Sequence, residues 1–210
     1  MRSSLIAILI AVMVVPNIGL AQQAGSFIAG GEVGFTSAMG DFRSDSLNAN
    51  TGFGIGIELR YALLNNISFG PFFRYHRFGS NIQSSAGNTS YNFTQYGGLA
   101  RINTFSLDKG KLYIIGGGGL FKPNSHLWTP DNTENIAFES GMFFTGGLGI
   151  SSNPLASTIY ELEVRYNMGE ADPVLAIGEG DPLNAQKFDF VYVAIKLSFN
   201  SKGTKAQPRY

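Results

Sequence analysis

The chain has 210 residues, 15 basic and 15 acidic side chains, and no cysteine. This balance gives no strong attraction to nucleic acid or to an anionic surface, and the lack of cysteine excludes disulfides and thiol chemistry. The 27 glycines and 17 phenylalanines are many for a chain of this length, and few segments show the 3.6-residue period of a helix. The composition therefore predicts an all-β fold in a single domain.

The first 21 residues have the layout of a secretory signal peptide. Arg2 supplies the basic start, Leu5 to Val15 form an unbroken apolar run, and Gly19 and Ala21 offer small residues for cleavage. The run is shorter than the about 20 residues that a transmembrane helix needs. We expect cleavage after Ala21, an exported barrel domain over residues 22–199 and a short tail over residues 200–210.

Eight strands follow in chain order. Most are close to the length of about 9–11 residues with which a tilted strand crosses a bilayer. They cover Phe27–Phe35, Gly52–Ala62, Ile67–His76, Tyr91–Thr104, Lys111–Phe121, Phe138–Ile150, Ser157–Met168 and Lys187–Phe199.

The connections between these strands alternate between long polar segments and short turns. The first is TSAMGDFRSDSLNAN and the second is LLNN, and the alternation continues to the last connection. Alternate connections of an up-and-down barrel lie at opposite ends, so we expect four long extracellular loops at one rim and short periplasmic turns at the other. A soluble barrel has no reason to sort its loops in this way.

The segment TIYELEVRYNM, residues 158–168, separates two kinds of side chain onto two faces of a strand. Leu162 and Val164 lie on one face, and Glu161, Glu163 and Arg165 lie on the other. Similar alternation occurs in the second, third, sixth and last strands, whereas the fourth and fifth have no decisive face. The residues that we assign to the faces opposite the apolar ones include five acidic and five basic side chains: Glu32, Glu58, Glu139, Glu161, Glu163, Arg60, Arg74, Arg101, Arg165 and Lys196.

The equal number of opposite charges favours an inward position for all ten. Side chains just fill the interior of an eight-stranded barrel. Charges enclosed there must pair, because an unpaired buried ion costs several kcal/mol, whereas charges in water need no matching. We therefore predict apolar residues that face lipid and an ionic network that plugs the lumen. The alternative is a soluble lipocalin-like barrel, which turns its apolar residues inward to hold a ligand.

Two longer segments resemble the repeated hairpin of the small OmpA/OmpX-type outer-membrane β-barrel proteins. GFGIGIELRYALLNNISFGPFFRYHRF and GGLGISSNPLASTIYELEVRYN share a glycine-rich strand, a polar turn with asparagine, and a strand ending in E-x-R-Y or F-R-Y, and KLYIIGGGGLFKP resembles the fifth strand of that family. The resemblance covers most of residues 26–199. It implies an eight-stranded antiparallel up-and-down transmembrane barrel in the outer membrane of a diderm bacterium, with membrane lipids and the barrel-assembly machinery as partners.

The same resemblance gives a role to Phe199. In that family the last strand ends in an aromatic residue that the assembly machinery reads, and Phe199 closes the last predicted strand. The chain departs from the pattern because SKGTKAQPRY follows, so this aromatic residue is not the C-terminus.

The sequence predicts no catalytic, cofactor or metal site and favours a structural or surface-interaction role, with an unidentified ligand of the loops. One alternative is a lipid A-modifying outer-membrane enzyme that uses His76, Ser80 and Glu58, and another is a narrow ion channel. His126 is the only other histidine, so no zinc-ligand set is evident. Trp128 is either a loop anchor or an interfacial aromatic residue.

The fourth long loop contains the related segments GEADP and GEGDP. Their carboxylates could gather on a hard cation such as Ca²⁺, although solvated acidic turns are the commoner outcome. The four residues concerned are Glu170, Asp172, Glu179 and Asp181.

Overall fold

The computed structural model describes residues 24–43, 48–84, 87–107, 110–128, 133–172 and 185–202. The predicted signal peptide, its cleavage site and most of the predicted tail lie outside these ranges. No helix within them is long and apolar enough to cross a membrane.

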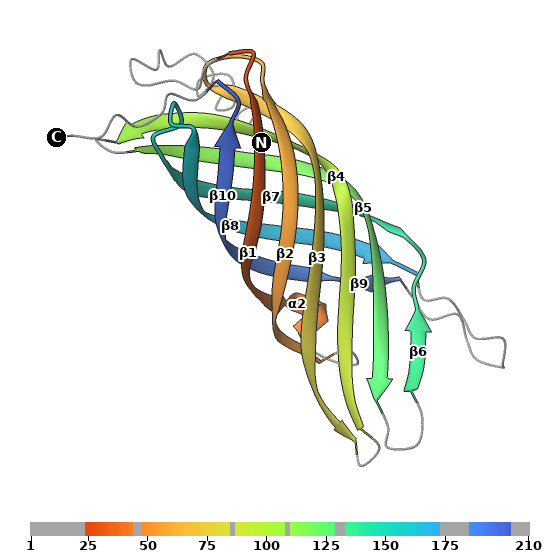
Figure 1. Ribbon diagram of the computed structural model, residues 1–210. Helices are drawn as coiled ribbons and strands as arrows, with labels where there is room; N and C mark the ends of the chain where they lie inside the picture. The colour runs from red at the N-terminus through yellow and green to blue at the C-terminus, as the bar shows by residue number, and fades with distance from the viewer. Residues whose placement is uncertain are drawn as a thin grey trace, which may run out of the picture.

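The described chain forms ten strands and one short helix (Figure 1). They are β1 (Phe27–Met39), α2 (Gly40–Arg43), β2 (Ala49–Ala62), β3 (Ile67–Ser84), β4 (Gly87–Leu107), β5 (Gly110–Trp128), β6 (Thr133–Ala137), β7 (Gly141–Ser152), β8 (Thr158–Ala171), β9 (Gln186–Lys187) and β10 (Asp189–Asn200).

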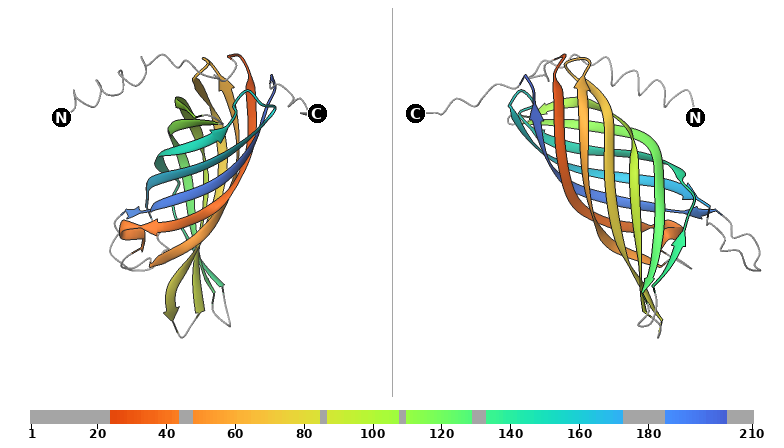
Figure 2. Two further views of the ribbon diagram at one scale, coloured as in Figure 1. Left: turned by 90° about the vertical axis from the view of Figure 1, so that its left-hand side faces the viewer. Right: turned by 45° about the vertical axis from the view of Figure 1, so that its right-hand side comes forward.

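Eight of these strands form a closed antiparallel barrel, as predicted. Each pairs with its neighbour in the order β1, β2, β3, β4, β5, β7, β8, β10, and β10 pairs in turn with β1. The short strands β6 and β9 add to β5 and β8. All the barrel strands are steeply tilted around a common axis (Figure 2). Within the closed barrel every strand has two partners, so none presents a free edge there.

Several strands have faces of reversed polarity compared with a soluble protein. In β8 the side chains of Glu161 and Arg165 are buried, while Leu162 and Val164 are 44% and 47% exposed. Large exposed apolar side chains occur on all eight barrel strands, including the two whose faces the sequence left open. On β5, for example, Ile114 faces outward and Tyr113 inward. The barrel therefore has a continuous apolar outer surface, which only a lipid or another apolar environment can cover.

Both described ends of the chain lie at the rim that carries the turn between β2 and β3. The amide of Ala24 donates a hydrogen bond to Oδ1 of Asn65 in this turn, and the amide of Phe27 donates to Oγ of Ser201. An even number of strands explains this placement, because the chain then enters and leaves the barrel at the same rim.

At the opposite rim, the prediction of long loops after the third and the fifth predicted strands is wrong, because strands continue through much of both segments. β3 continues to Ser84 and β4 begins at Gly87, so only residues 85–86 separate the two strands. β5 continues to Trp128 and pairs with β6. These four strands project beyond the others as an extension of the barrel wall (Figure 1). Backbone pairing does not require apolar side chains, so a polar composition marked the edge of the apolar belt and not the end of the strands.

Candidate functional site in the barrel lumen

The structure brings together nine of the ten charged residues that the sequence placed in the lumen. All nine are buried, and they come from six strands, since alternate residues of each strand point to the interior. We call this set the ionic network: Glu32, Glu58, Arg60, Arg74, Arg101, Glu161, Glu163, Arg165 and Lys196.

The half of the network nearer the short turns is centred on Glu161. Its carboxylate accepts hydrogen bonds from Arg60 Nη2 at 3.1 Å and from Arg101 Nη1, and the hydroxyl of Ser198 donates to it at 3.2 Å. Arg60 Nε also lies 2.7 Å from Oε1 of Glu58. Two guanidinium groups, from β2 and β4, therefore share one carboxylate of β8 across the lumen.

The other half is centred on Glu32. Arg74 Nε lies 2.6 Å from Oε1 of this residue, and Arg165 Nη2 donates to Oε2. Lys196 links the two halves, because its Nζ lies 2.9 Å from Glu58 and 3.1 Å from Glu163. The network is continuous across the lumen and joins strands that are distant in sequence.

Glu139 is not part of the network, which corrects the prediction. It is exposed and lies between β6 and β7, where its amide donates a hydrogen bond to the carbonyl of Asp172. β7 begins two residues later, at Gly141, so Glu139 lies outside the barrel wall. Extending the alternation of β7 backwards past its first residue caused the error.

Lys111 is a buried basic residue that the sequence reasoning missed. It lies near the start of β5, whose faces were left open, and its Nζ has no hydrogen-bond partner among the described residues. The buried charges of the described chain are therefore six basic and four acidic. The predicted balance of five and five is wrong for the residues that the structure describes, whose buried side chains have an excess of two positive charges.

A cluster of aromatic side chains fills the lumen on the side away from the short turns, and the sequence analysis did not predict it. Phe42 of α2 points into it, with ring centroids 5.0 Å from Phe78, 5.3 Å from Phe93 and 5.4 Å from Phe188. Edge-to-face and tilted contacts at these distances stabilise such clusters beyond the burial of area alone. We call this set the aromatic cluster: Phe42, Phe78, Tyr91, Phe93, Phe121, Phe138, Phe143, Phe188 and Phe190.

A signal for the aromatic cluster was present in the periodicity. Arg74, His76 and Phe78 are successive alternate residues of β3, and all three are buried. Following the inward series past its last charged residue would have led to Phe78, and the same series in β10 leads from Lys196 back to Phe190.

The three residues of the enzymatic alternative do not converge. The predicted third strand ended at His76, which put Ser80 in a loop, but Ser80 lies in β3. Its hydroxyl donates a hydrogen bond to the carbonyl of Asn48 at 3.1 Å. It is four residues from His76, which corresponds to about 13 Å along a strand. The His76 ring is buried, with Nε2 3.2 Å from Gln95 Oε1, and Glu58 belongs to the ionic network.

The proposed cation ligands are only partly within the described chain. Glu170 and Asp172 are exposed, whereas Glu179 and Asp181 lie outside the described residues. The side chains of His126 and Trp128 also lie outside them. Among the described residues there is no group of three histidine, cysteine or acidic side chains that could hold a metal ion.

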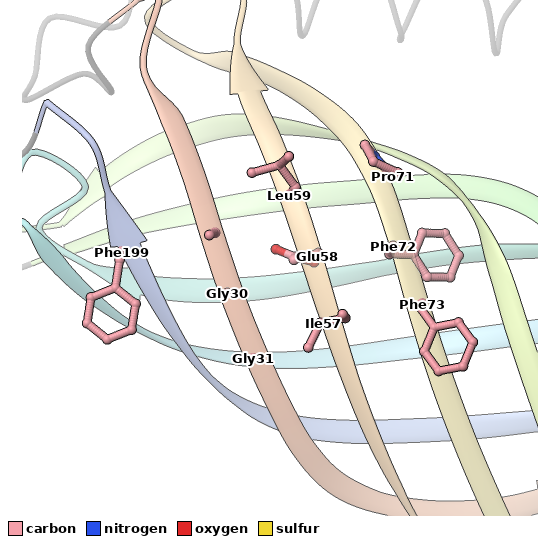
Figure 3. A pocket seen from close by; sticks show the side chains of 10 residues that line it. Gly30, Gly31, Ile57, Glu58, Leu59, Pro71, Phe72, Phe73 and Phe199 are labelled. Carbon is pink, nitrogen blue, oxygen red and sulfur yellow. The ribbon is translucent and has the colours of Figure 1, made fainter.

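Phe199 lies on the outer surface near the end of β10 and is 57% exposed. It borders an apolar groove of about 600 Å³ whose floor includes Gly30 and Gly31, with Leu59 and Phe73 on the other side (Figure 3). The groove is part of the apolar outer surface and contains no arrangement of polar groups suited to catalysis.

Together, the closed eight-stranded barrel, its apolar outer face and its ionic interior define the fold of the small outer-membrane β-barrel proteins. Solved structures that share it include the following two. Neisserial surface protein A (NspA) is 15% identical, with a TM-score of 0.54, and the match covers 83% of this chain and 98% of that one. OprG of Pseudomonas aeruginosa is 11% identical, with a TM-score of 0.51, and the match covers 86% and 98%.

These likenesses confirm the resemblance to OmpA/OmpX-type barrels at the level of the fold. No protein-family model matches the sequence, and no curated protein matches it significantly.

Proposed function

We propose that this protein is exported and inserted in the outer membrane of a diderm bacterium, where its sealed barrel has a structural or surface-interaction role. The observation that carries the proposal is the reversed polarity of the barrel wall, with Leu162 and Val164 exposed and Glu161 and Arg165 buried. The test is fractionation of cells that express the full chain. The protein is expected in the detergent-extracted outer-membrane fraction, and release into aqueous buffer would favour a soluble barrel.

The lumen is proposed to be closed to ions. The ionic network links strands on opposite sides of the interior through Arg165 and Glu32, and the aromatic cluster fills the other end around Phe42 and Phe93. A pathway for hydrated ions would have to break the network and also separate these rings. Planar-bilayer recordings of the refolded barrel are expected to be silent, and stepwise conductance would show a narrow channel instead.

A surface role is supported by the extension formed by β3, β4, β5 and β6. These strands continue past the point where β1 and β2 end their pairing, at Ser37 and Thr51, so they form a platform above the apolar belt. Loops and projections on a rigid scaffold are common sites of recognition. Replacing residues 81–89 with a two-residue turn is expected to abolish binding to a surface partner while the barrel still assembles.

The enzymatic alternative has a direct test in lipid A. Because His76, Ser80 and Glu58 do not converge, lipid A from a host that expresses the protein is expected to have an unchanged mass spectrum. A new acylated or deacylated species that disappears in the His76→Gln variant would overturn the non-enzymatic proposal.

Export and assembly are proposed to use the signal peptide and Phe199. N-terminal sequencing of the mature protein is expected to start at Gln22. Phe199→Ser is expected to reduce the amount of barrel assembled in cells, while the same variant refolds in detergent. The matched control is Leu197→Ser, which changes another outward residue of β10 and tests whether loss of apolar surface alone explains the effect.

A further inference from the structure

A layer of buried polar side chains separates the ionic network from the aromatic cluster. Its members come from six strands, and the strand register places Thr36 opposite Tyr192 and Thr145 opposite Asn167. We call this set the polar layer: Thr36, His76, Gln95, Thr145, Asn167 and Tyr192.

Most members of this layer have buried polar atoms without a hydrogen-bond partner in the described chain. These atoms are Thr36 Oγ1, Thr145 Oγ1, Nδ1 of His76 and both polar side-chain atoms of Asn167. An unpaired buried polar atom is costly, so proteins satisfy nearly all such groups. Five in one layer indicate partners that are not protein side chains, such as water or an ion.

The adjoining part of the ionic network contains guanidinium groups with unused hydrogen-bond donors. Arg74 and Arg165 share the carboxylate of Glu32. Both terminal nitrogens of Arg74 and Nη1 of Arg165 have no hydrogen-bond partner among the described residues, although Arg74 Nη2 lies 3.9 Å from Glu58. Arg165 also pairs with Glu163 through Nε, so the unused groups are these three guanidinium nitrogens, on residues that lie two positions along β3 and β8 from His76 and Asn167.

The sign of the lumen charge decides which kind of partner fits. The described lumen has six basic and four acidic buried side chains, one of the basic ones being Lys111 beside the short turns, and uncompensated charge in such an interior is strongly unfavourable. The unpaired oxygens alone would also suit a cation, but the two arginines repel one. An anion accepts from the N–H and O–H donors and reduces the charge excess at the same time, while Oδ1 of Asn167, an acceptor, is not one of its contacts.

We propose that the polar layer binds a small inorganic anion of the size of chloride, held by Arg74 and Arg165 together with Thr145 and Asn167. Gly117 lies directly opposite Thr145 in the strand register, and Gly97 lies opposite Gly119, so no side chain fills the lumen from these positions. The aromatic cluster and the ionic network close the layer on both sides, which excludes larger organic anions. This site goes beyond the proposed function, because it assigns the barrel interior a ligand.

Bromide replaces chloride in the test because it is detected by anomalous scattering. The full barrel is unfolded and refolded in detergent with sodium bromide, so that the anion can enter before the lumen closes, and is then crystallised. An anomalous peak between Arg74, Arg165 and Asn167 is expected. Peaks only on the outer surface, or water alone in the polar layer, would overturn the proposal.

A matched pair of variants extends this test to solution. The double variant Thr145→Val, Asn167→Leu removes polar atoms of the polar layer but keeps side-chain size. The control Thr94→Val makes the same threonine change on β4, on the face opposite to that of the buried Gln95. The wild type and Thr94→Val are expected to unfold at a higher temperature in bromide than in gluconate of equal ionic strength. The double variant is expected to show no such difference. Equal midpoints in both salts for the wild type would also overturn the proposal, whether or not the double variant folds.

Discussion

The two ends of the lumen are filled by different chemistry. The ionic network near the short turns depends on specific pairs, such as Arg74 with Glu32, whereas the aromatic cluster depends on the shape and contact of many similar rings. Removing one partner of a buried ion pair leaves a charge without compensation, but removing part of one ring leaves a gap that its neighbours can partly fill. The two ends should therefore respond differently to substitution.

The largest expected effect is at the centre of the ionic network. Glu32→Ala removes the carboxylate that Arg74, Arg165 and Lys196 share. The free energy of unfolding is expected to fall by about 3–5 kcal/mol, as measured by urea titration in lipid vesicles with heat-modified gel mobility as the readout. Val33→Ala is the control, since Val33 is the next residue and faces outward. Equal losses in the two variants would contradict the central place of Glu32.

A smaller effect is expected where a charge is added to the outer face of the wall. Ile195 is 67% exposed on β10, next to the buried Lys196. Ile195→Arg is expected to lower the free energy of unfolding in vesicles by about 2–4 kcal/mol, because a cation on the lipid face is costly near the middle of the bilayer. Ile195→Leu should be close to neutral. An Ile195→Arg barrel as stable as the wild type would place this face in water.

The smallest of the three effects is expected in the aromatic cluster. Phe42→Leu keeps an apolar side chain of similar size but removes the ring contacts with Phe78, Phe93 and Phe188. The free energy of unfolding is expected to fall by about 1–2 kcal/mol, since each aromatic pair adds about 0.5–1.5 kcal/mol beyond burial and leucine keeps part of the contact with these rings. Arg43→Ala, at the exposed neighbour, is the control. A loss as large as that of Glu32→Ala would remove the distinction between the two ends.

The difference between the two ends also explains what the sequence could predict. Charged residues in strict alternation with Leu162 and Val164 are unusual in a protein core, so Glu161, Glu163 and Arg165 could be assigned to the lumen from the pattern of one strand. A phenylalanine gives no such contrast, because it is equally suited to lipid and to a lumen. The direction of Phe78 or Phe93 depends on the register of its strand and could be read only by extending that register through polar residues.

Strand ends were harder to predict than strand faces for a related reason. The belt ends where apolar residues stop, but backbone pairing of β3 with β4 continues to Ser84 and Gly87. The wrong assignment of Glu139 and the missed Lys111 both arose at such boundaries or on strands without a clear face. Hydrogen bonds between strands, and not side-chain polarity, determine where these segments end.

The most direct test of the inverted barrel uses the lack of native cysteine. Leu162→Cys and Val164→Cys each introduce a single site for a nitroxide spin label, and electron paramagnetic resonance then measures its collisions with oxygen and with a water-soluble nickel complex. Labels at both positions are expected to collide often with oxygen and rarely with nickel, as in a bilayer interior. Frequent collisions with nickel at both positions would place this face in water and contradict the membrane assignment.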